Sequence, residues 1–349
     1  MNQKVQLAIL GAGRIAQVHM QGYQRIRTKV EVCAVVDPRP EIATRKAAEW
    51  SVGANFQTLD ELLKRQPCDA IDICVPHHLH LDCARKACLA GKHVLLEKPI
   101  ARTLAEADQI LQAATQSGVN LMIAHNHVFN PLIQKAKRVL DAGLIGKAHL
   151  VKAQSLGWFF FSENDFRQSE EETGGGVFID TGAHFVYILR HLFGEVEAVT
   201  ALQNNSLRHE MQGEDTAIVV LRFKSGCLGE ITASYAARIP GWQSGFPTGW
   251  DQGFLILGER GALRFSLTED KLWIYSEADS FPSEFRGWTA ISVPHAYADS
   301  FNLELEHFID SITEQSAPKV PGSEGRKTLE IIDAAYRSAQ TGRVVTLNG

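Results

Sequence analysis

The chain has no long apolar run and no excess of basic charge, and each absence excludes a class of partner. Its 349 residues include 35 Lys and Arg against 40 Asp and Glu, a formal net charge of −5. That balance gives no general attraction for nucleic-acid phosphates or anionic lipid, and no basic stripe with interleaved aromatic residues occurs. No window approaches the roughly 20 apolar residues that a membrane-spanning helix needs. We therefore expect neither a nucleic-acid partner nor a membrane partner.

Paired cysteines and an export signal are also missing. The six cysteines, at positions 33, 68, 74, 83, 88 and 227, form no Cys-x-x-Cys pair, and their apolar or helical surroundings are typical of buried, reduced thiols. The chain runs from Met1 to Lys4 directly into an apolar strand, without the pattern of a cleaved signal peptide. These features predict a cytoplasmic protein in a reducing compartment.

The chain is long enough to form two hydrophobic cores, and the pattern of its apolar residues changes near residue 126. Before it, short strands that are apolar throughout alternate with helices, which predicts an α/β domain built on a parallel sheet with both faces covered. We expect strands at 5–10, 30–36, 70–75, 93–96 and 120–124, with helices at 14–25, 41–50, 59–65, 80–90 and 104–117. The predicted domains are residues 1–126, which bind a dinucleotide, and residues 127–349, which bind substrate and form oligomer contacts.

The second part begins with a helix at 131–142 and then changes to apolar residues with a period of two. This pattern predicts an α+β domain with a mainly antiparallel sheet. We expect strands at 216–223, 227–236, 253–257, 261–267 and 271–275, and closing helices at 300–313 and 325–339. The long segments 156–173 and 238–253 are predicted to be loops that shape a pocket or an interface.

The segment after the first strand carries the residues of a dinucleotide-binding turn. Gly11-Ala12-Gly13-Arg14-Ile15-Ala16 fits G-x-G-x-x-G/A, in which glycines allow a tight turn and a close approach of the pyrophosphate. The helix that follows offers its N-terminal N–H groups to phosphate. Asp37, at the end of the second strand, suits the adenosine ribose hydroxyls and repels a 2′-phosphate, so NAD is favoured, while Arg39 keeps NADP open. The alternative is a glycine turn beside a surface aspartate.

Two further segments carry candidate chemistry. Glu97-Lys98-Pro99 follows the fourth predicted strand of the parallel sheet, at the edge where ligands bind in doubly wound sheets. The alternative for this segment is a surface ion pair before a helix. Three glycines at 174–176 precede Asp180 and His184, which share one face if the segment is helical.

Together these motifs resemble the Gfo/Idh/MocA family, the glucose-fructose oxidoreductase and inositol dehydrogenase group of nicotinamide enzymes. The resemblance covers nearly the whole chain and also rests on Pro76, His80 and the Glu214-Asp215-Thr216 segment. It implies an N-terminal Rossmann domain followed by a domain with a large, open, mainly antiparallel sheet. It also implies that cofactor and substrate meet between these domains, and that the chain assembles as a homodimer or homotetramer.

The resemblance places the family's catalytic lysine on Lys98, its substrate-orienting aspartate on Asp180 and its proton-transferring histidine on His184. This agrees with the chemistry of alcohol oxidation, in which a base takes the hydroxyl proton as hydride leaves, because an imidazole titrates near neutrality. A partly desolvated Lys98 would stabilise negative charge on the reacting oxygen. One departure is Tyr187, where many members carry Asp, so a polyol contact is in doubt.

Further residues are expected near the ligands. The residues expected to touch the cofactor are Gly11, Gly13, Arg14, Ile15, Asp37, Arg39, Pro76, His80, Glu97, Lys98 and Asn126. Those expected near a substrate are His127, Trp158, Asp180 and His184, with the phenylalanines 159–161 either walling the pocket or packing in a core. We expect no metal, because His77, His78 and His80 with Cys74 lack the spacing of a closed four-ligand zinc site.

Three functional classes stay open on these residues. The first is an NAD(P)-dependent dehydrogenase or reductase that moves a hydride between nicotinamide and a secondary alcohol of a sugar, sugar derivative or polyol. The second is a glycoside hydrolase or lyase that oxidises and re-reduces its sugar with tightly held NAD. The third is a nicotinamide-binding sensor without catalytic activity. The presence of Lys98, Asp180 and His184 disfavours this class.

Overall fold

The computed structural model describes residues 4–163, 165–239, 250–278 and 287–347 and divides into two compact units. The first unit contains Met1–Asn126 and Ser300–Leu329, and the second contains His127–Asp299 and Glu330–Gly349. The sequence-based division gave all of 127–349 to the second domain, whereas in the structure residues 300–329 pack with the first. Most of the expected loop at 238–253, including Pro240, Trp242 and Pro247, lies outside the described residues.

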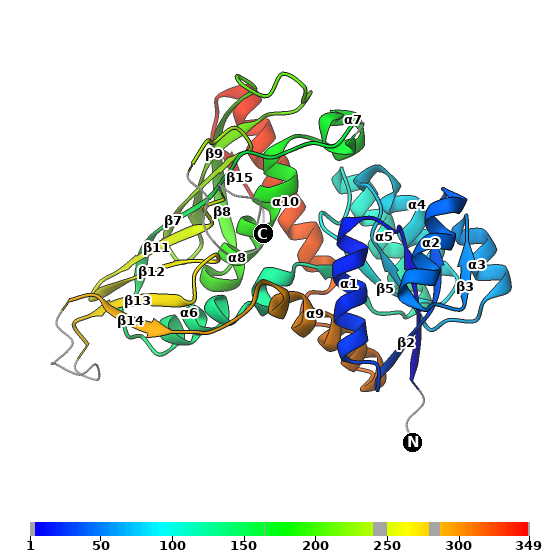
Figure 1. The fold of residues 1–349 in the computed structure, drawn as a ribbon. Coiled ribbons are helices and arrows are strands. Elements are labelled where there is room, and N and C mark those ends of the chain that lie inside the picture. The colour runs from blue at the N-terminus through cyan, green and yellow to red at the C-terminus, as the bar shows by residue number, and fades with distance from the viewer. Residues whose placement is uncertain (1–3, 164, 240–249, 279–286, 348–349) are drawn as a thin grey trace. The chain divides into compact units, whose positions relative to one another are not determined.

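The first unit is built on a parallel sheet with the strand order β3-β2-β1-β4-β5-β6 among the described residues (Figure 1). The strands are β1 Val5–Leu10, β2 Val30–Val36, β3 Ala54–Phe56, β4 Ala70–Ile73, β5 His93–Glu97 and β6 Leu121–Ala124. All neighbours pair in parallel. This is the Rossmann strand order. The order of strands along the chain changes sense between β1 and β4, and at such a point ligands bind beyond the carboxyl ends of the strands.

The helices that connect these strands are α1 Arg14–Arg25, α2 Pro40–Trp50, α3 Leu59–Arg65, α4 His80–Leu89 and α5 Leu104–Ser117. Helical crossovers between parallel strands are almost always right-handed. Because β2 lies on one side of β1 and β5 on the other side of β4, right-handed connections put α1 and α4 on opposite faces of the sheet. The doubly wound α/β fold predicted for this region is therefore confirmed.

The returning chain completes the first unit with α9 Tyr297–Thr313 and the first part of α10 Gly322–Thr341. A Cβ added to Gly22 of α1 would lie 2.4 Å from Leu305, so α1 and α9 pack closely at this glycine. Next to the edge strand β6, the backbone N–H of Ile123 donates to the carbonyl of Val320 at 2.9 Å. The returning segment therefore covers α1 and continues the hydrogen bonding beyond the edge of the sheet.

The second unit is built on a nine-stranded sheet, counted over the described residues, with the order β14-β13-β12-β11-β7-β10-β9-β8-β15. Only the central pair, β7 and β10, is parallel. The strands are β7 Ala148–Leu156, β8 Val196–Asn204, β9 Thr216–Phe223, β10 Leu228–Ser234, β11 Gly253–Gly258, β12 Gly261–Ser266, β13 Lys271–Ser276, β14 Thr289–Ser292 and β15 Val345–Thr346. The predicted large, mainly antiparallel sheet is confirmed.

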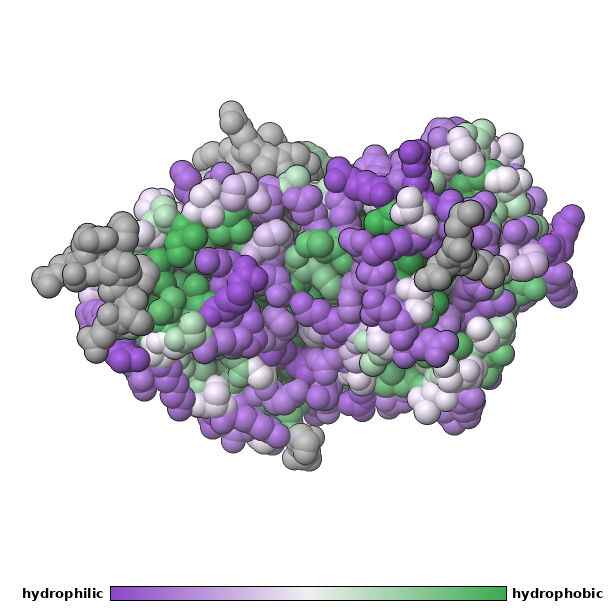
Figure 2. Space-filling model, turned by 90° about the horizontal axis from the view of Figure 1, so that it is seen from below, coloured by the Kyte–Doolittle hydropathy of each residue, from purple (hydrophilic) through white to green (hydrophobic). Residues whose placement is uncertain are grey.

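One face of this sheet is buried and the other is exposed. Along β9 buried and exposed side chains alternate, as the period of two predicts. The buried face packs against α8 Ala183–Phe193, while α6 Pro131–Asp141 contacts β13. The exposed face carries large apolar side chains, namely Leu202, Ile218, Val220 and Leu228. On the side of the molecule drawn in Figure 2, hydrophilic side chains predominate and apolar ones gather in separate patches.

The structure contains five strands that the sequence analysis did not predict. They are β3, β7, β8, β14 and β15, of which β7 and β8 have nine residues each, and two helices start earlier than expected, α9 at Tyr297 and α10 at Gly322. All six cysteines are free thiols, five of them buried. No helix among the described residues is both long and apolar enough to cross a membrane.

Candidate active site

The glycine turn after β1 has the geometry that a pyrophosphate needs. Gly11 has φ +92°, and a Cβ there would lie 2.4 Å from the carbonyl oxygen of Cys74, so only glycine fits. Gly13 is the N-cap of α1, and no atom of the described residues lies within 4 Å of a Cβ built on it. Ala16 is completely buried, where helix and sheet touch. The turn thus leaves open space beside the N terminus of α1, which suits an anion.

Asp37 lies at the end of β2, next to this turn, and is already paired. One carboxylate oxygen accepts the N–H of Ala12 at 3.1 Å, and the guanidinium of Arg39 binds both oxygens, at 2.8 and 3.0 Å. Burial opposes the ionised form, but these donors lower the pKa of Asp37 below its usual value. An ionised carboxylate at this position fits the ribose of NAD. Arg39, whose side chain is 60% exposed, is held against Asp37.

Lys98 directly follows β5, at the same carboxyl edge of the sheet. Its backbone N–H donates to the side chain of Glu97 at 3.1 Å. His80 is completely buried, and its ring nitrogens lie 2.8 Å from the carbonyl oxygen of Pro99 and 3.0 Å from that of Val75. His80 therefore joins the turn after β4 to the turn after β5. Burial lowers the pKa of His80, and the two carbonyls act in the opposite direction.

The other predicted cofactor residues of the first unit lie around the same edge. Arg14 and Ile15 form the first turn of α1, and Pro76 caps the short helix that precedes α4. Asn126, just after β6, is buried and donates to Ser300 at 3.0 Å. The unit thus brings the predicted nucleotide residues to the carboxyl ends of β1, β2, β4, β5 and β6.

In the second unit, Asp180 lies in a π-helical turn, Phe178–Gly182, which leads into α8. One oxygen of its carboxylate accepts from Arg167 Nε at 2.8 Å and from the hydroxyl of Tyr235 at 2.6 Å. Arg167 also donates to Asp165 at 3.1 Å, and its guanidinium lies 4.4 Å from the ring centroid of Phe166. Burial opposes the charge of Arg167, but Asp180 and its neighbours raise the pKa of the guanidinium above its usual value. Asp180 is thus held in one orientation.

The glycine segment before Asp180 is fixed by Glu214. The carboxylate of Glu214 accepts the N–H of Gly176 at 2.9 Å, the N–H of Phe178 at 2.8 Å and the hydroxyl of Tyr336 at 3.0 Å. A Cβ on Gly176 would lie 2.0 Å from the carbonyl oxygen of Glu214, so the two segments touch through their backbones. Glu214, one of the motif residues, therefore shapes the turn that carries Asp180.

His184 lies in the first turn of α8 beside His127. The two rings meet edge to face, with centroids 4.5 Å apart and planes at 78°. His127 is 7% exposed, and Tyr187, at the position where many relatives carry Asp, is 5% exposed. The second unit thus brings together the two histidines that the sequence placed near the substrate.

The predicted aromatic wall is largely a packed cluster. The guanidiniums of Arg208 and Arg238 lie 4.3 and 3.6 Å from the ring centroid of Trp158. The rings of Phe159 and Phe161 lie 4.9 Å apart, and Phe159 also packs on Tyr235 at 4.8 Å. Phe160 is 68% exposed. Phe159 and Phe161 are half-buried in this cluster, and their place in the pocket wall stays a prediction.

The sequence analysis did not identify the two residues that bind Asp180, Arg167 and Tyr235. Arg167 lies in the expected pocket loop at 156–173, where no motif marks an arginine. Tyr235 follows β10 in a run that shows only the alternation of a strand. No local signal identifies either one, because each becomes significant only through its contact with Asp180.

The fold and these residues define an oxidoreductase with an NAD-binding Rossmann domain. Residues 5–125 match the family model described as "Oxidoreductase family, NAD-binding Rossmann fold", and residues 137–347 match its "C-terminal alpha/beta domain". The chain therefore belongs to the Gfo/Idh/MocA oxidoreductase family. The predicted family, enzyme class and NAD cofactor are confirmed.

Named relatives match along their whole length. The chain is 28% identical to myo-inositol 2-dehydrogenase of Thermotoga maritima, over 98% of both chains. It is 26% identical to scyllo-inositol 2-dehydrogenase (NAD(+)) of Bacillus subtilis, over 100% of this chain and 98% of that one. A solved structure of levoglucosan dehydrogenase with NADH and levoglucosan shares the fold with a TM-score of 0.91, at 21% identity over 99% of this chain and 100% of that one.

Proposed function

We propose that this protein transfers a hydride between NAD and a secondary alcohol of a neutral sugar or polyol. The observation that carries the proposal is the pairing of Asp180 with Arg167 and Tyr235 in the turn that leads to His184. An oriented carboxylate one helical turn before an imidazole is a suitable arrangement for binding a hydroxyl and removing its proton. The inositol dehydrogenases among the relatives support the same substrate class.

The charges around Asp180 favour a substrate without a carboxylate. Asp165 and Asp180 both bind Arg167, so two carboxylates stand against one guanidinium. A sugar acid would add a third negative charge to this cluster, and like charges at such distances repel strongly when partly buried. We therefore expect neutral polyols or sugars to be preferred over aldonic or uronic acids.

We assign the proton chemistry to His184, Asp180 and Lys98. His184 takes the proton of the reacting hydroxyl, and Asp180 orients that hydroxyl. Lys98 stabilises the negative charge that develops on the reacting oxygen as the proton leaves. NAD, when bound, supplies the hydride acceptor, and Gly11, Gly13 and Asp37 are the residues that would hold it.

The test follows NADH absorbance while the purified protein is incubated with NAD+ and a panel of inositols, aldoses, levoglucosan, sugar acids and glycosides. Stoichiometric NADH formation with a neutral polyol or sugar supports the proposal. Consumption of a glycoside without net NADH would instead indicate a redox-assisted hydrolase. Tight NAD+ binding without turnover of any compound would indicate a sensor.

The lysine assignment has its own variant. Lys98→Ala is expected to lower kcat by roughly 10²-fold or more, the size of one proton-transfer or charge-stabilising group, with little change in NAD+ affinity measured by fluorescence titration. Lys86→Ala is the matched control, since Lys86 pairs with Asp60 at the exposed surface. Normal turnover by the Lys98 variant would show the assignment to be wrong.

A further inference from the structure

The first unit buries a group of ionisable side chains close to the proposed catalytic lysine. We call it the His19 cluster: it consists of His19 and Tyr23 of α1, Asp72 and Cys74 at the end of β4, Glu97 at the end of β5 and Glu304 of α9. Glu97 has 12% of its side chain exposed, and the other five are buried. Ionisable groups are rarely buried without partners, because desolvation penalises their charged forms.

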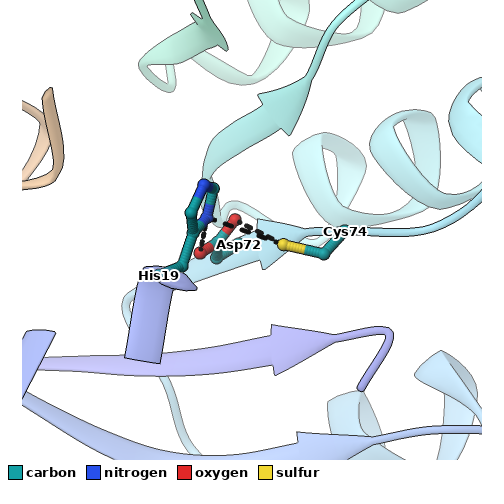
Figure 3. Close-up of side chains that lie close together, drawn as sticks. All are labelled: His19, Asp72 and Cys74. Atoms are coloured by element: carbon teal, nitrogen blue, oxygen red, sulfur yellow. Dashed lines mark hydrogen bonds and ion pairs between the residues drawn. The ribbon is translucent and has the colours of Figure 1, made fainter. Parts of the chain in front are cut away.

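His19 is the centre of the cluster (Figure 3). Its Nδ1 lies 2.8 Å from Asp72 Oδ2, which also accepts the hydroxyl of Tyr23 at 3.0 Å. Cys74 Sγ donates to the other oxygen of Asp72 at 3.4 Å. The far nitrogen of the ring, Nε2, lies 3.4 Å from Glu97 Oε1. The imidazole therefore has a carboxylate on each side.

An imidazole between two carboxylates is stabilised as the doubly protonated cation, which has a donor for each of them. Burial opposes the charge, but Asp72 and Cys74 raise the pKa of His19 well above its ordinary value. The ring of Phe301 packs on the imidazole, with centroids 5.9 Å apart, so water is kept from this side.

Glu304 faces the same cluster from α9 in its neutral form. It is completely buried, and neither side-chain oxygen has a hydrogen bond to any residue that the structure describes. Burial raises its pKa well above the usual range, and the negative charges of Glu97 and Asp72 add to this effect, although His19 opposes it. A neutral Glu304 leaves two carboxylates in the cluster against the one imidazolium.

Glu97 joins this cluster to the proposed catalytic residue. One of its carboxylate oxygens lies against His19 Nε2, and the other accepts the backbone N–H of Lys98 at 3.1 Å. A single side chain thus extends from the buried imidazole to the backbone of the lysine. At the imidazole end the contact is an ion pair at 3.4 Å without a hydrogen bond, and at the lysine end it is a hydrogen bond.

We propose that His19 is a positioning residue for Lys98: it pairs with Glu97, and Glu97 in turn holds the backbone N–H of the lysine. The inference rests on the proposed function, since it concerns the residue to which that function assigns charge stabilisation. A cluster that served packing alone would affect stability but would leave the lysine unchanged. The two roles are therefore separable by measurement.

The test compares His19→Asn with His93→Asn. The asparagine amide takes the place of Nδ1, so His19→Asn keeps a partner for Asp72 and loses the atom that faces Glu97. His93 begins the same strand that Glu97 ends, and its Nδ1 accepts the N–H of Asn120 at 3.0 Å, a bond that an asparagine oxygen can also accept. Acetic anhydride labelling of Lys98 is measured at one pH by peptide mass spectrometry, relative to that of Lys86. Thermal melting of each variant reports that it is folded.

In His19→Asn the labelling of Lys98 relative to Lys86 is expected to rise about 3-fold or more, because the segment that carries Lys98 is no longer held through Glu97. With NAD+ and myo-inositol, kcat is expected to fall about 10-fold while KM for NAD+ changes less than about 3-fold. The His93 control leaves both the labelling and kcat unchanged. An unchanged or lowered labelling ratio in folded His19→Asn would overturn the proposal.

Two outcomes are kept apart by this design. If the wild-type protein turns over no polyol or sugar, the proposed function fails, but the labelling ratio of Lys98 still decides whether His19 positions it. If His19→Asn does not fold, Glu97→Ala replaces it, because that carboxylate is partly exposed and its loss leaves the imidazole in place. Its labelling ratio is expected to rise by at least as much, and an unchanged ratio would overturn the proposal equally.

Discussion

Each of the two units buries a glutamate, and the two side chains differ in their hydrogen bonding. In the second unit, Glu214 accepts two backbone N–H groups and a tyrosine hydroxyl, and it shapes a turn. In the first unit, Glu304 has no hydrogen bond to a described residue and lies among other carboxylates. Burial raises the pKa of both. Hydrogen-bond donors oppose this rise in pKa at Glu214, whereas Glu304 has no such donor among the described residues. Glu214 therefore fixes the turn around it, and Glu304 favours its protonated form.

The largest effect on stability is expected from a substitution in the turn that Glu214 fixes. Gly176→Ala would place a Cβ 2.0 Å from the carbonyl oxygen of Glu214, which neither backbone can avoid. We expect a loss of more than about 4 kcal/mol in the free energy of unfolding, or no folded protein. Urea denaturation measures it.

Gly118→Ala is the control for that substitution. Gly118 has a positive φ, +64°, which Gly176 lacks, and no atom of the described part of the chain lies within 4 Å of its Cβ. The expected cost is the local backbone term alone, about 1 to 2 kcal/mol. Equal losses at the two glycines would mean that contact with Glu214 does not matter.

A direct comparison of the two glutamates gives the next largest effect. Glu214→Gln replaces one acceptor oxygen with an N–H donor that faces a backbone N–H or a tyrosine hydroxyl, and we expect a loss of about 2 to 4 kcal/mol in the free energy of unfolding. Glu304→Gln replaces a neutral carboxyl with a neutral amide, and the expected change is within about 1 kcal/mol. Urea denaturation at neutral pH measures both. Similar losses would contradict the distinction.

The smallest effect is a difference in pH dependence. Because the folded-state pKa of Glu304 is raised, its contribution to stability is complete below the unfolded value of about 4.3 and is lost as pH rises through the folded-state pKa. Between these values the wild-type protein loses up to about 1.4 kcal/mol per pH unit through this group. Glu304→Gln is expected to lack that slope. Parallel stability curves for the two proteins would show that Glu304 is ionised in the folded state.

Much of the first unit could be predicted because its signals are local. The helices α3 and α5 have the predicted bounds, and each starts after a threonine, Thr58 or Thr103, whose side chain accepts the N–H three residues later. The glycine turn and Asp37 lie within one strand-helix-strand unit, so their spacing alone indicates a dinucleotide site. The three-residue β3 is too short for any period to identify.

The contacts around Asp180 and in the His19 cluster join segments that are far apart in the sequence, so no local spacing of residues predicts them. Arg167 and Tyr235 reach Asp180 from two different segments, and no pattern in either one indicates a partner. The same holds for Glu304, which lies far along the chain from His19 although both belong to one cluster. The sequence therefore indicates the groups that chemistry requires, but not those that orient them.

The return of residues 300–329 to the first unit affects the order in which the protein can form. When the ribosome has released only the first 126 residues, α1 lacks its contact with Leu305, and Ile123 lacks the carbonyl of Val320. The nascent nucleotide-binding unit thus keeps uncovered apolar surface until nearly the whole chain has been synthesised. Fragments that stop before residue 329 are expected to depend on chaperones, since such surface promotes aggregation during synthesis.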